Sequence, residues 1–313
     1  MITTRFIDRS IRPSEISPET MPLKRRTFLT QLSAGAALTQ MRFVSATADE
    51  SPFKQARKSV YSTAEKITDF VEATTKTRFR ELEADIEKNA TAYEPYPWRV
   101  TVSGACLKPG VFDLDALRKL APLEERIYRM RCTEGWSHVV PYIGYPLAEL
   151  LKQVQPTGNA KYVEFTSMLD PQQFKGQRDV TYISWPYVEG LRMDEALHPL
   201  TLLALGSYGQ ALPKALGAPL AIRVPWKYGI KSPKAVVQIR LTETQPLTVW
   251  VKHYPQYHSF WSNVNPAVSP SRWSSRASER RAGDLARRPT LPFNGYGEQV
   301  AQLYQGMNPN ALF

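Results

Sequence analysis

The chain has 313 residues and a formal net charge of +11, from 40 lysine and arginine residues against 29 aspartate and glutamate residues. No run approaches the ~20 apolar residues of a membrane-spanning helix. No basic block is interleaved with stacking aromatic residues, so nucleic acid is not expected as a partner.

The first 48 residues predict a targeting segment. The pair Arg25-Arg26, followed by Thr27-Phe28-Leu29, resembles a twin-arginine export motif. A mildly apolar stretch follows at 32–38, and Ala46-Thr47-Ala48 offers a small-x-small cleavage site. We therefore expect residues 1–48 to be a twin-arginine signal peptide and the remaining chain to be exported. Residues 1–48 hold seven basic and three acidic residues, so the exported part keeps a net charge of +7, which suits an anionic cofactor, an acidic partner or a membrane surface.

Residues 49–94 predict a helical N-terminal extension, because Phe79, Leu82 and Ile86 recur at helical spacing within 62–90. Residues 95–313 contain no repeat and no flexible linker up to residue 245, so we expect one domain. Alternation and turn residues predict the following strands: 98–104, 127–132, 162–166, 187–191, 220–225 and 235–241. Helices are predicted at 112–117, with an aspartate as N-cap, at 146–154 and at 194–197. A buried apolar segment is expected at 200–208 and an extended wrap over the core after residue 245. This irregular mixture favours an α+β fold over a doubly wound sheet.

Cys132 is one of only two cysteines in the chain, and arginines surround it in the run Arg126-Ile127-Tyr128-Arg129-Met130-Arg131-Cys132. Most free cysteines are small buried hydrophobic residues. A positive field, however, favours the thiolate, which is the form that attacks electrophiles and binds metals. The alternation places Cys132 on the face opposite Arg129 and Arg131, so the arginines need not touch the sulfur.

Several separated runs together resemble one enzyme family, and no single run is decisive. They include Arg129-Met130-Arg131-Cys132 and Val224-Pro225-Trp226-Lys227-Tyr228-Gly229. The complete ordered set is 122–132, 140–144, 186–192, 196–202, 217–219, 224–231, 263–266, 272–274 and 293–296. This set resembles the molybdopterin-dependent catalytic subunit of periplasmic protein-methionine-sulfoxide reductases, which have the sulfite oxidase fold. The resemblance covers about residues 95–313 and the leader.

The resemblance implies one molybdenum–molybdopterin cofactor per chain, with Cys132 as catalytic residue and metal ligand. A soft thiolate suits a redox-active transition metal. The family's pterin-contacting threonine falls on Ser167, and its contacts to the pterin phosphate fall on the loop Ser232-Pro233-Lys234. Two further cations are expected to bind this cofactor: Lys231, beside the loop, and Arg223.

The resemblance also implies the reaction and the partners. Methionine sulfoxide, free or in oxidised periplasmic proteins, would lose its oxygen to the reduced metal. A membrane-bound haem subunit would return the electrons. The dimerising domain of sulfite oxidases proper has no counterpart, so a monomer is expected. We expect Cys106 and Cys132 to stay unpaired.

Three family cofactor contacts are missing or displaced. No asparagine occurs in the stretch that begins at Phe70, the asparagine before Gly217 is Leu216, and the arginine after Pro219 is Ala221. Arg223 lies one strand repeat further on the same face. Two alternatives therefore stay open, another oxidoreductase of the sulfite oxidase fold and a non-catalytic exported protein without the cofactor.

The remaining polar residues predict little chemistry. The histidines His138, His198, His253 and His258 lack zinc-site spacing. We expect His198 to be structural and the histidines of the tail, His253 and His258, to be on the surface. Glu134 is expected to be solvated or paired, although it could shuttle protons near a metal.

Overall fold

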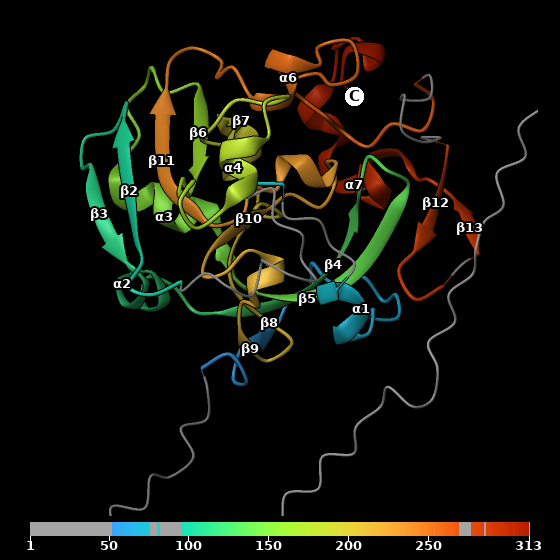
Figure 1. The fold of residues 1–313 in the computed structure, drawn as a ribbon, viewed down its shortest axis with the longest axis horizontal. Coiled ribbons are helices and arrows are strands. Elements are labelled where there is room, and N and C mark those ends of the chain that lie inside the picture. Colours follow the sequence, from blue (N-terminus) through green and yellow to red (C-terminus); the bar gives the residue numbers. More distant parts are fainter. Residues whose placement is uncertain (1–51, 76–79, 82–94, 269–276, 285, 313) are drawn as a thin grey trace, which may run out of the picture. The chain divides into compact units, whose positions relative to one another are not determined.

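A computed structural model of the protein describes residues 52–75, 80–81, 95–268, 277–284 and 286–312 (Figure 1). The leader predicted for 1–48 lies outside these residues, as do 76–79 and 82–94 of the predicted helical extension. Residues 62–69, predicted to begin that helix, are not helical, and helix α1 spans only Phe70–Thr75. Thr68 instead donates its backbone N–H to Val139 O, at 2.9 Å, and Val139 lies in strand β5 (Trp136–Pro146).

Two sheets form the framework, and Figure 1 shows the smaller one on the left. The five-stranded sheet has the order β3 (Gly110–Asp113), β2 (Arg99–Gly104), β11 (Val236–Thr242), β6 (Tyr162–Ser167) and β7 (Val188–Arg192). The central strand β11 runs parallel to β2 and antiparallel to β6. Strand β11 therefore pairs with β2, which lies more than a hundred residues earlier in the chain, and joins it to β6 in one sheet.

The eight-stranded sheet centres on the antiparallel pair β4 (Glu124–Arg131) and β5 (Trp136–Pro146). Its other strands are β1 (Arg57–Lys58), β8 (Leu202–Ser207), β9 (Gln210–Ala211), β10 (Ala221–Arg223), β12 (Ser278–Arg281) and β13 (Arg287–Pro289). Strand β8 pairs with both β5 and β10, and β12 continues the sheet from the start of β5. The turn between β4 and β5 therefore lies beside the tail of the chain.

Short helices connect and cover the sheets. They are α2 (Leu114–Lys119), α3 (Leu147–Val154), α4 (Lys175–Asp179), α5 (Met193–Leu197), α6 (Val249–His253) and α7 (Gly297–Val300), with 3₁₀ turns η2 (Lys214–Leu216), η3 (Gly229–Lys231), η4 (Pro292–Gly295), η5 (Ala301–Tyr304) and η6 (Pro309–Ala311). Asp113 caps α2 as predicted, because its Oδ1 accepts the N–H of Ala116 at 2.8 Å. Helix α3 is amphipathic and buries Leu147, Leu150 and Leu151 in the core.

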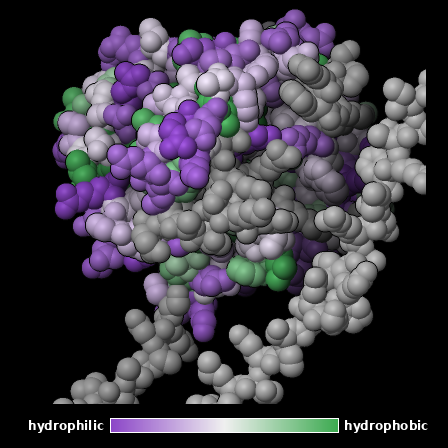
Figure 2. Space-filling model, in the orientation of Figure 1, coloured by the Kyte–Doolittle hydropathy of each residue, from purple (hydrophilic) through white to green (hydrophobic). Residues whose placement is uncertain are grey.

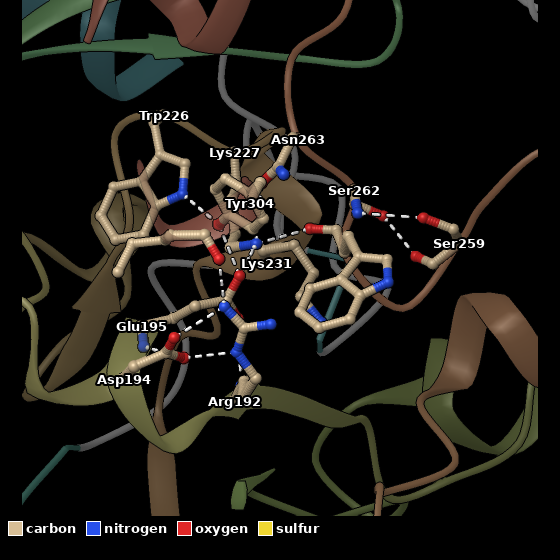
Figure 3. Close-up of polar contacts among 12 residues, drawn as sticks. Arg192, Asp194, Glu195, Trp226, Lys227, Lys231, Ser259, Ser262, Asn263 and Tyr304 are labelled. Atoms are coloured by element: carbon tan, nitrogen blue, oxygen red, sulfur yellow. Dashed lines mark hydrogen bonds and ion pairs between the residues drawn. The ribbon is translucent and has the colours of Figure 1, made fainter. Parts of the chain in front are cut away.

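The tail after residue 245 packs on the core as short helices, 3₁₀ turns and the strands β12 and β13 rather than as an extended wrap, and a buried polar cluster holds it there (Figure 3). Lys227 Nζ pairs with Glu195 Oε1 at 2.6 Å, and neither side chain is exposed. The same ammonium donates to Trp261 O and to Asn263 Oδ1, both at 2.8 Å. Tyr304 donates its hydroxyl to Glu195. Burial lowers the pKa of Lys227 to about 8, although the charge of Glu195 opposes this shift. Lys227 therefore fastens the tail to the core.

The face seen in Figure 2 is mostly hydrophilic, with scattered hydrophobic groups. Among the described residues, no helix has the length and apolar character needed to cross a membrane.

Candidate active site

A cavity of about 890 Å³ opens at the turn between β4 and β5. Its lining combines a thiol, cationic groups and aromatic rings from the eight-stranded sheet, the connecting loops and the tail. The principal lining residues are Cys132, His138, Tyr142, Arg223, Lys234 and Trp250. Cys106 lies elsewhere, in a separate hollow of about 830 Å³ that Arg240 also lines. Both cysteines are free.

Cys132 follows the last residue of β4, and a tight turn presents its side chain to the cavity. Its N–H donates to Trp136 O at 2.7 Å, and Gly135 closes the turn with a φ of 89°. The N–H of Glu134 lies 3.4 Å from Cys132 Sγ. The thiol is therefore held on one side by the backbone and faces open space on the other.

The flanking arginines are paired with carboxylates and act only weakly on this thiol. Arg131 is buried, and its Nε lies 3.0 Å from Glu279 Oε2. Arg129 pairs with Glu65 at 3.1 Å. Loss of hydration inside the cavity raises the pKa of Cys132, although its surface is accessible; the charge of Glu134 adds to the increase, whereas the Glu134 N–H and Arg131 oppose it. Arg131 thus acts in the direction that favours the thiolate, but the loss of hydration in the cavity wall outweighs it in the chain without a metal. A metal ion would deprotonate the thiol on binding.

Arg223 and Lys234 supply positive charge to the cavity. The guanidinium of Arg223 lies over the Tyr142 ring, 4.6 Å from its centroid, and it donates to the carbonyl oxygen of Leu216. Lys234 Nζ lies 3.3 Å from Glu81 Oε2. These cations and, above all, burial lower the pKa of His138 to about 3, so His138 is neutral.

The loop before Lys234 is rigidly held. Ser232 Oγ accepts the N–H of Val224 at 3.1 Å, and the carbonyl of Pro233 accepts the N–H of Ile222 at 2.9 Å. Ser232 O also accepts a hydrogen bond from Arg223, at 3.4 Å. The structure thus places Cys132, Arg223 and Lys234 in the wall of one cavity, and the loop of Ser232 and Pro233 holds the strand that carries Arg223.

Four of the predicted site residues do not line this cavity: Ser232 and Pro233, which lie in the loop before Lys234, and Lys231 and Ser167. Lys231 Nζ is 2.7 Å from Glu189 Oε2 and lies over the ring of Phe260, with its side chain only 1% exposed. Ser167 is fully buried at the end of β6 and donates its N–H to Tyr187 O, at 3.0 Å, while Tyr187 itself lines the cavity.

The positions that depart from the family pattern have different surroundings. Phe70 packs edge-on against Tyr208, 5.3 Å between ring centroids, and does not line the cavity. Leu216 lines it, and Ala221 is buried in β10 opposite Ala204 of β8. Arg223 therefore brings into the cavity a guanidinium that position 221 lacks.

Sequence reasoning missed other lining residues. Glu81 and Arg80 reach the cavity from before the first strand of the smaller sheet. Arg80 donates to the Tyr182 hydroxyl at 2.9 Å and pairs with Glu134 at 3.4 Å, so Glu134 is paired as expected. His258 was predicted on the surface, but it is 5% exposed and packs against Trp250 in the cavity wall. No local pattern marks these residues, since tertiary contacts bring them in.

His198 is half-buried and bonds the backbone twice. Its Nε2 lies 3.0 Å from Gln299 O, and its Nδ1 accepts the N–H of Leu200 at 3.2 Å. This supports the structural role that was predicted for it.

The donor set fits a cofactor with a soft metal at one end and an anion at the other. Within the described part of the chain, Arg223 Nε is buried in the cavity wall and lacks a hydrogen-bond partner. Such orphaned buried donors are unusual and are typical of sites that bind a ligand. A thiol faces the same cavity as the cations, and its volume is that of a typical cofactor site.

Comparison with known families agrees with this arrangement. The model of the oxidoreductase molybdopterin binding domain matches residues 87–250. The mixed sheets with short helices, the molybdopterin-binding fold and the oxidoreductase class that the sequence predicted are confirmed.

Three curated relatives match nearly the whole chain, and each is named protein-methionine-sulfoxide reductase catalytic subunit MsrP. The relative from Burkholderia mallei is 48% identical and covers 96% of this chain and 95% of its own length. Those from Ralstonia nicotianae and Xanthomonas campestris are 46% and 47% identical, covering 97% and 96% of this chain, and 96% and 97% of their own lengths. The chain belongs to this family of protein-methionine-sulfoxide reductase catalytic subunits.

Among solved structures, the sulfane dehydrogenase SoxCD from Paracoccus pantotrophus aligns with a TM-score of 0.41 at 19% identity, covering 50% of this chain and 40% of its own.

Proposed function

We propose that the protein reduces methionine sulfoxide to methionine at a molybdenum–molybdopterin centre whose protein ligand is the Cys132 thiolate. The overall change is a sulfoxide plus two electrons and two protons giving a thioether and water. The cofactor supplies a metal that accepts the sulfoxide oxygen. The observation that carries the proposal is the placement of Cys132 Sγ on the wall of the same cavity that holds Arg223 and Lys234.

The residues at the far end of the cavity have a binding role. Arg223 and Lys234, with the rigid backbone of Ser232 and Pro233, would hold the anionic phosphate end of the cofactor. Ser167, which bonds the backbone of Tyr187, would contact the cofactor if the cavity wall at Tyr187 opens toward it. Lys231 is committed to Glu189, so we assign it a structural role rather than phosphate binding.

The aromatic residues at the cavity mouth would receive the substrate side chain. Trp136 and Tyr182 are 42% and 40% exposed and line the cavity together with Trp250. Aromatic rings attract the polarizable sulfur of methionine. Because these rings remain accessible, a methionine sulfoxide carried by an oxidised protein could enter as well as the free amino acid.

The remaining parts of the proposal concern location and electron supply. The Arg25-Arg26 motif and the site ending at Ala48 support export to the periplasm by the twin-arginine route. Oxidised periplasmic proteins would be the substrates. A membrane-bound haem subunit would return two electrons per turnover, and the term "catalytic subunit" in the relatives' names supports such a partner.

Positions 70, 216 and 221 carry none of the polar family contacts, so the proposal depends on the other residues of the cavity to hold the cofactor. The decisive assay is reduction of methionine sulfoxide by the purified protein with a reduced artificial electron donor. Cys132→Ser should be inactive while it keeps the wild-type circular dichroism spectrum. An active Cys132→Ser protein would contradict the proposed role of the thiolate.

A further inference from the structure

A carboxylate of the chain itself occupies the anion-binding end of the cavity. Glu81 is 2% exposed, and its Oε1 accepts the backbone N–H of Lys234 at 3.0 Å. Its Oε2 lies 3.3 Å from Lys234 Nζ. The carboxylate of Glu81 therefore accepts hydrogen bonds from both the backbone N–H and the side-chain ammonium of Lys234.

Such a pair of donors is a general anion site. A main-chain N–H and an ammonium that converge on one point bind a carboxylate or a phosphate in the same way. Two cations, Arg223 and Lys234, line the cavity beside the carboxylate of Glu81. The site thus carries more positive charge than one carboxylate neutralises.

We infer that Glu81 holds the place of the cofactor's phosphate group and must release Lys234 before the cofactor binds. This inference rests on the proposed function, in which Lys234 holds that phosphate. A carboxylate and a phosphate on the same two donors would repel each other strongly in a buried site. The two anions therefore compete, and Lys234 is paired in both states of the protein.

The main chain at Glu81 is anchored independently of its carboxylate. Gln177, on α4, donates from Nε2 to Glu81 O at 3.1 Å and to Met168 O at 2.8 Å. Gln177 is itself 4% exposed. Exchange of the carboxylate for phosphate thus requires rotation of the Glu81 side chain, while Gln177 retains its backbone contact.

The test compares Glu81→Gln with the wild-type chain and with a matched control, Glu189→Gln. Glu189 is also a buried glutamate that pairs with a lysine of the same region, Lys231, but it does not line the cavity. Cofactor-free full-length protein of each kind is titrated with inorganic phosphate by calorimetry. Molybdenum content is measured separately on protein from cells grown with limiting molybdate.

Glu81→Gln should bind phosphate at least tenfold more tightly than wild type and should carry more molybdenum per chain. Its melting temperature should rise with added phosphate more than that of wild type. Glu189→Gln should keep the wild-type phosphate affinity within about twofold, because the cavity keeps its charges.

Phosphate affinity in Glu81→Gln equal to or below that of wild type would overturn the inference. If the wild-type protein nevertheless contains molybdenum, the proposed function is retained and only the role inferred for Glu81 is rejected. A wild-type protein that takes up no molybdenum would instead overturn the proposed function, and the phosphate titration would still decide the role of Glu81. The titration is repeated with Glu81→Ala. Glu81→Gln removes the charge but keeps an oxygen that can accept a hydrogen bond from Lys234, whereas Glu81→Ala removes both.

Discussion

Replacing Lys227 with methionine should destabilise the protein severely while leaving the cavity lining intact. The ammonium is fully buried and makes one ion pair and two hydrogen bonds to the tail. Its removal leaves the Glu195 carboxylate buried with two neutral donors, the hydroxyl of Tyr304 and the N–H of Arg192. Lys227 does not line the cavity, so the effect is one of stability.

The magnitude follows from the charge that is left behind. Breaking a buried ion pair by removing one partner costs about 3–5 kcal/mol, because the other charge remains desolvated. For a domain of this size, that corresponds to a fall in melting temperature of roughly 6–20 °C. If Glu195 is also changed to glutamine, no buried charge remains, and the double variant should lose about 2 kcal/mol less than the sum of the two single variants.

The assay is urea unfolding of cofactor-free wild type, Lys227→Met, Glu195→Gln and the double variant, followed by tryptophan fluorescence. Leu216→Met, a volume-conserving change in the cavity wall, serves as the control and should cost less than about 1.5 kcal/mol. Single-variant losses below 1 kcal/mol, or losses that simply add in the double variant, would refute the argument that this pair fastens the tail.

Three further predictions concern other parts of the chain. Arg25→Lys with Arg26→Lys should retain the protein in the cytoplasm, and normal export of this double variant in cell fractionation would contradict the signal. His138 has a pKa of about 3 when folded, below its value of about 6.5 when unfolded, so the unfolded chain binds the proton first as pH falls. The stability of the cofactor-free protein should thus drop below pH 6.5 by up to ~1.4 kcal/mol per pH unit, and less steeply in His138→Gln, as urea titrations at each pH will measure. Cys106→Ser should retain more than about half of the sulfoxide reductase activity, since Cys106 lies outside the cavity of Cys132; a dead Cys106 variant would show that the wrong cysteine has been assigned.

The strands with regular alternation were predictable, and those with prolines were not. The prediction at 127–132 corresponds to β4, and that at 235–241 corresponds to β11. Strand β5, the longest, escaped prediction because Pro141, Gly144 and Pro146 interrupt its pattern and it is buried over most of its length. Strand β12 depends on pairing with β5 across more than a hundred residues, which no local signal contains, and β13 pairs with β12.

The candidate site was predictable where motif and geometry agree. Strand alternation predicted that Arg223 lies on the same face of its strand as position 221. Arg223 lines the cavity together with Cys132. Lys231 and Lys234 look alike in the sequence, but the 3₁₀ turn ending at Lys231 directs its side chain to Glu189, while Lys234 reaches the cavity. Glu81 was beyond prediction, because its partner lies 153 residues away.

The central claim is that Cys132 binds a molybdenum atom in this cavity. The most direct measurement is elemental analysis of the purified full-length protein together with molybdenum X-ray absorption, for wild type and Cys132→Ser. We predict about one molybdenum atom per wild-type chain, because one thiol faces the cavity, and the loss of one molybdenum–sulfur contact in the variant. Wild-type protein without molybdenum, or an unchanged sulfur shell in Cys132→Ser, would contradict the claim.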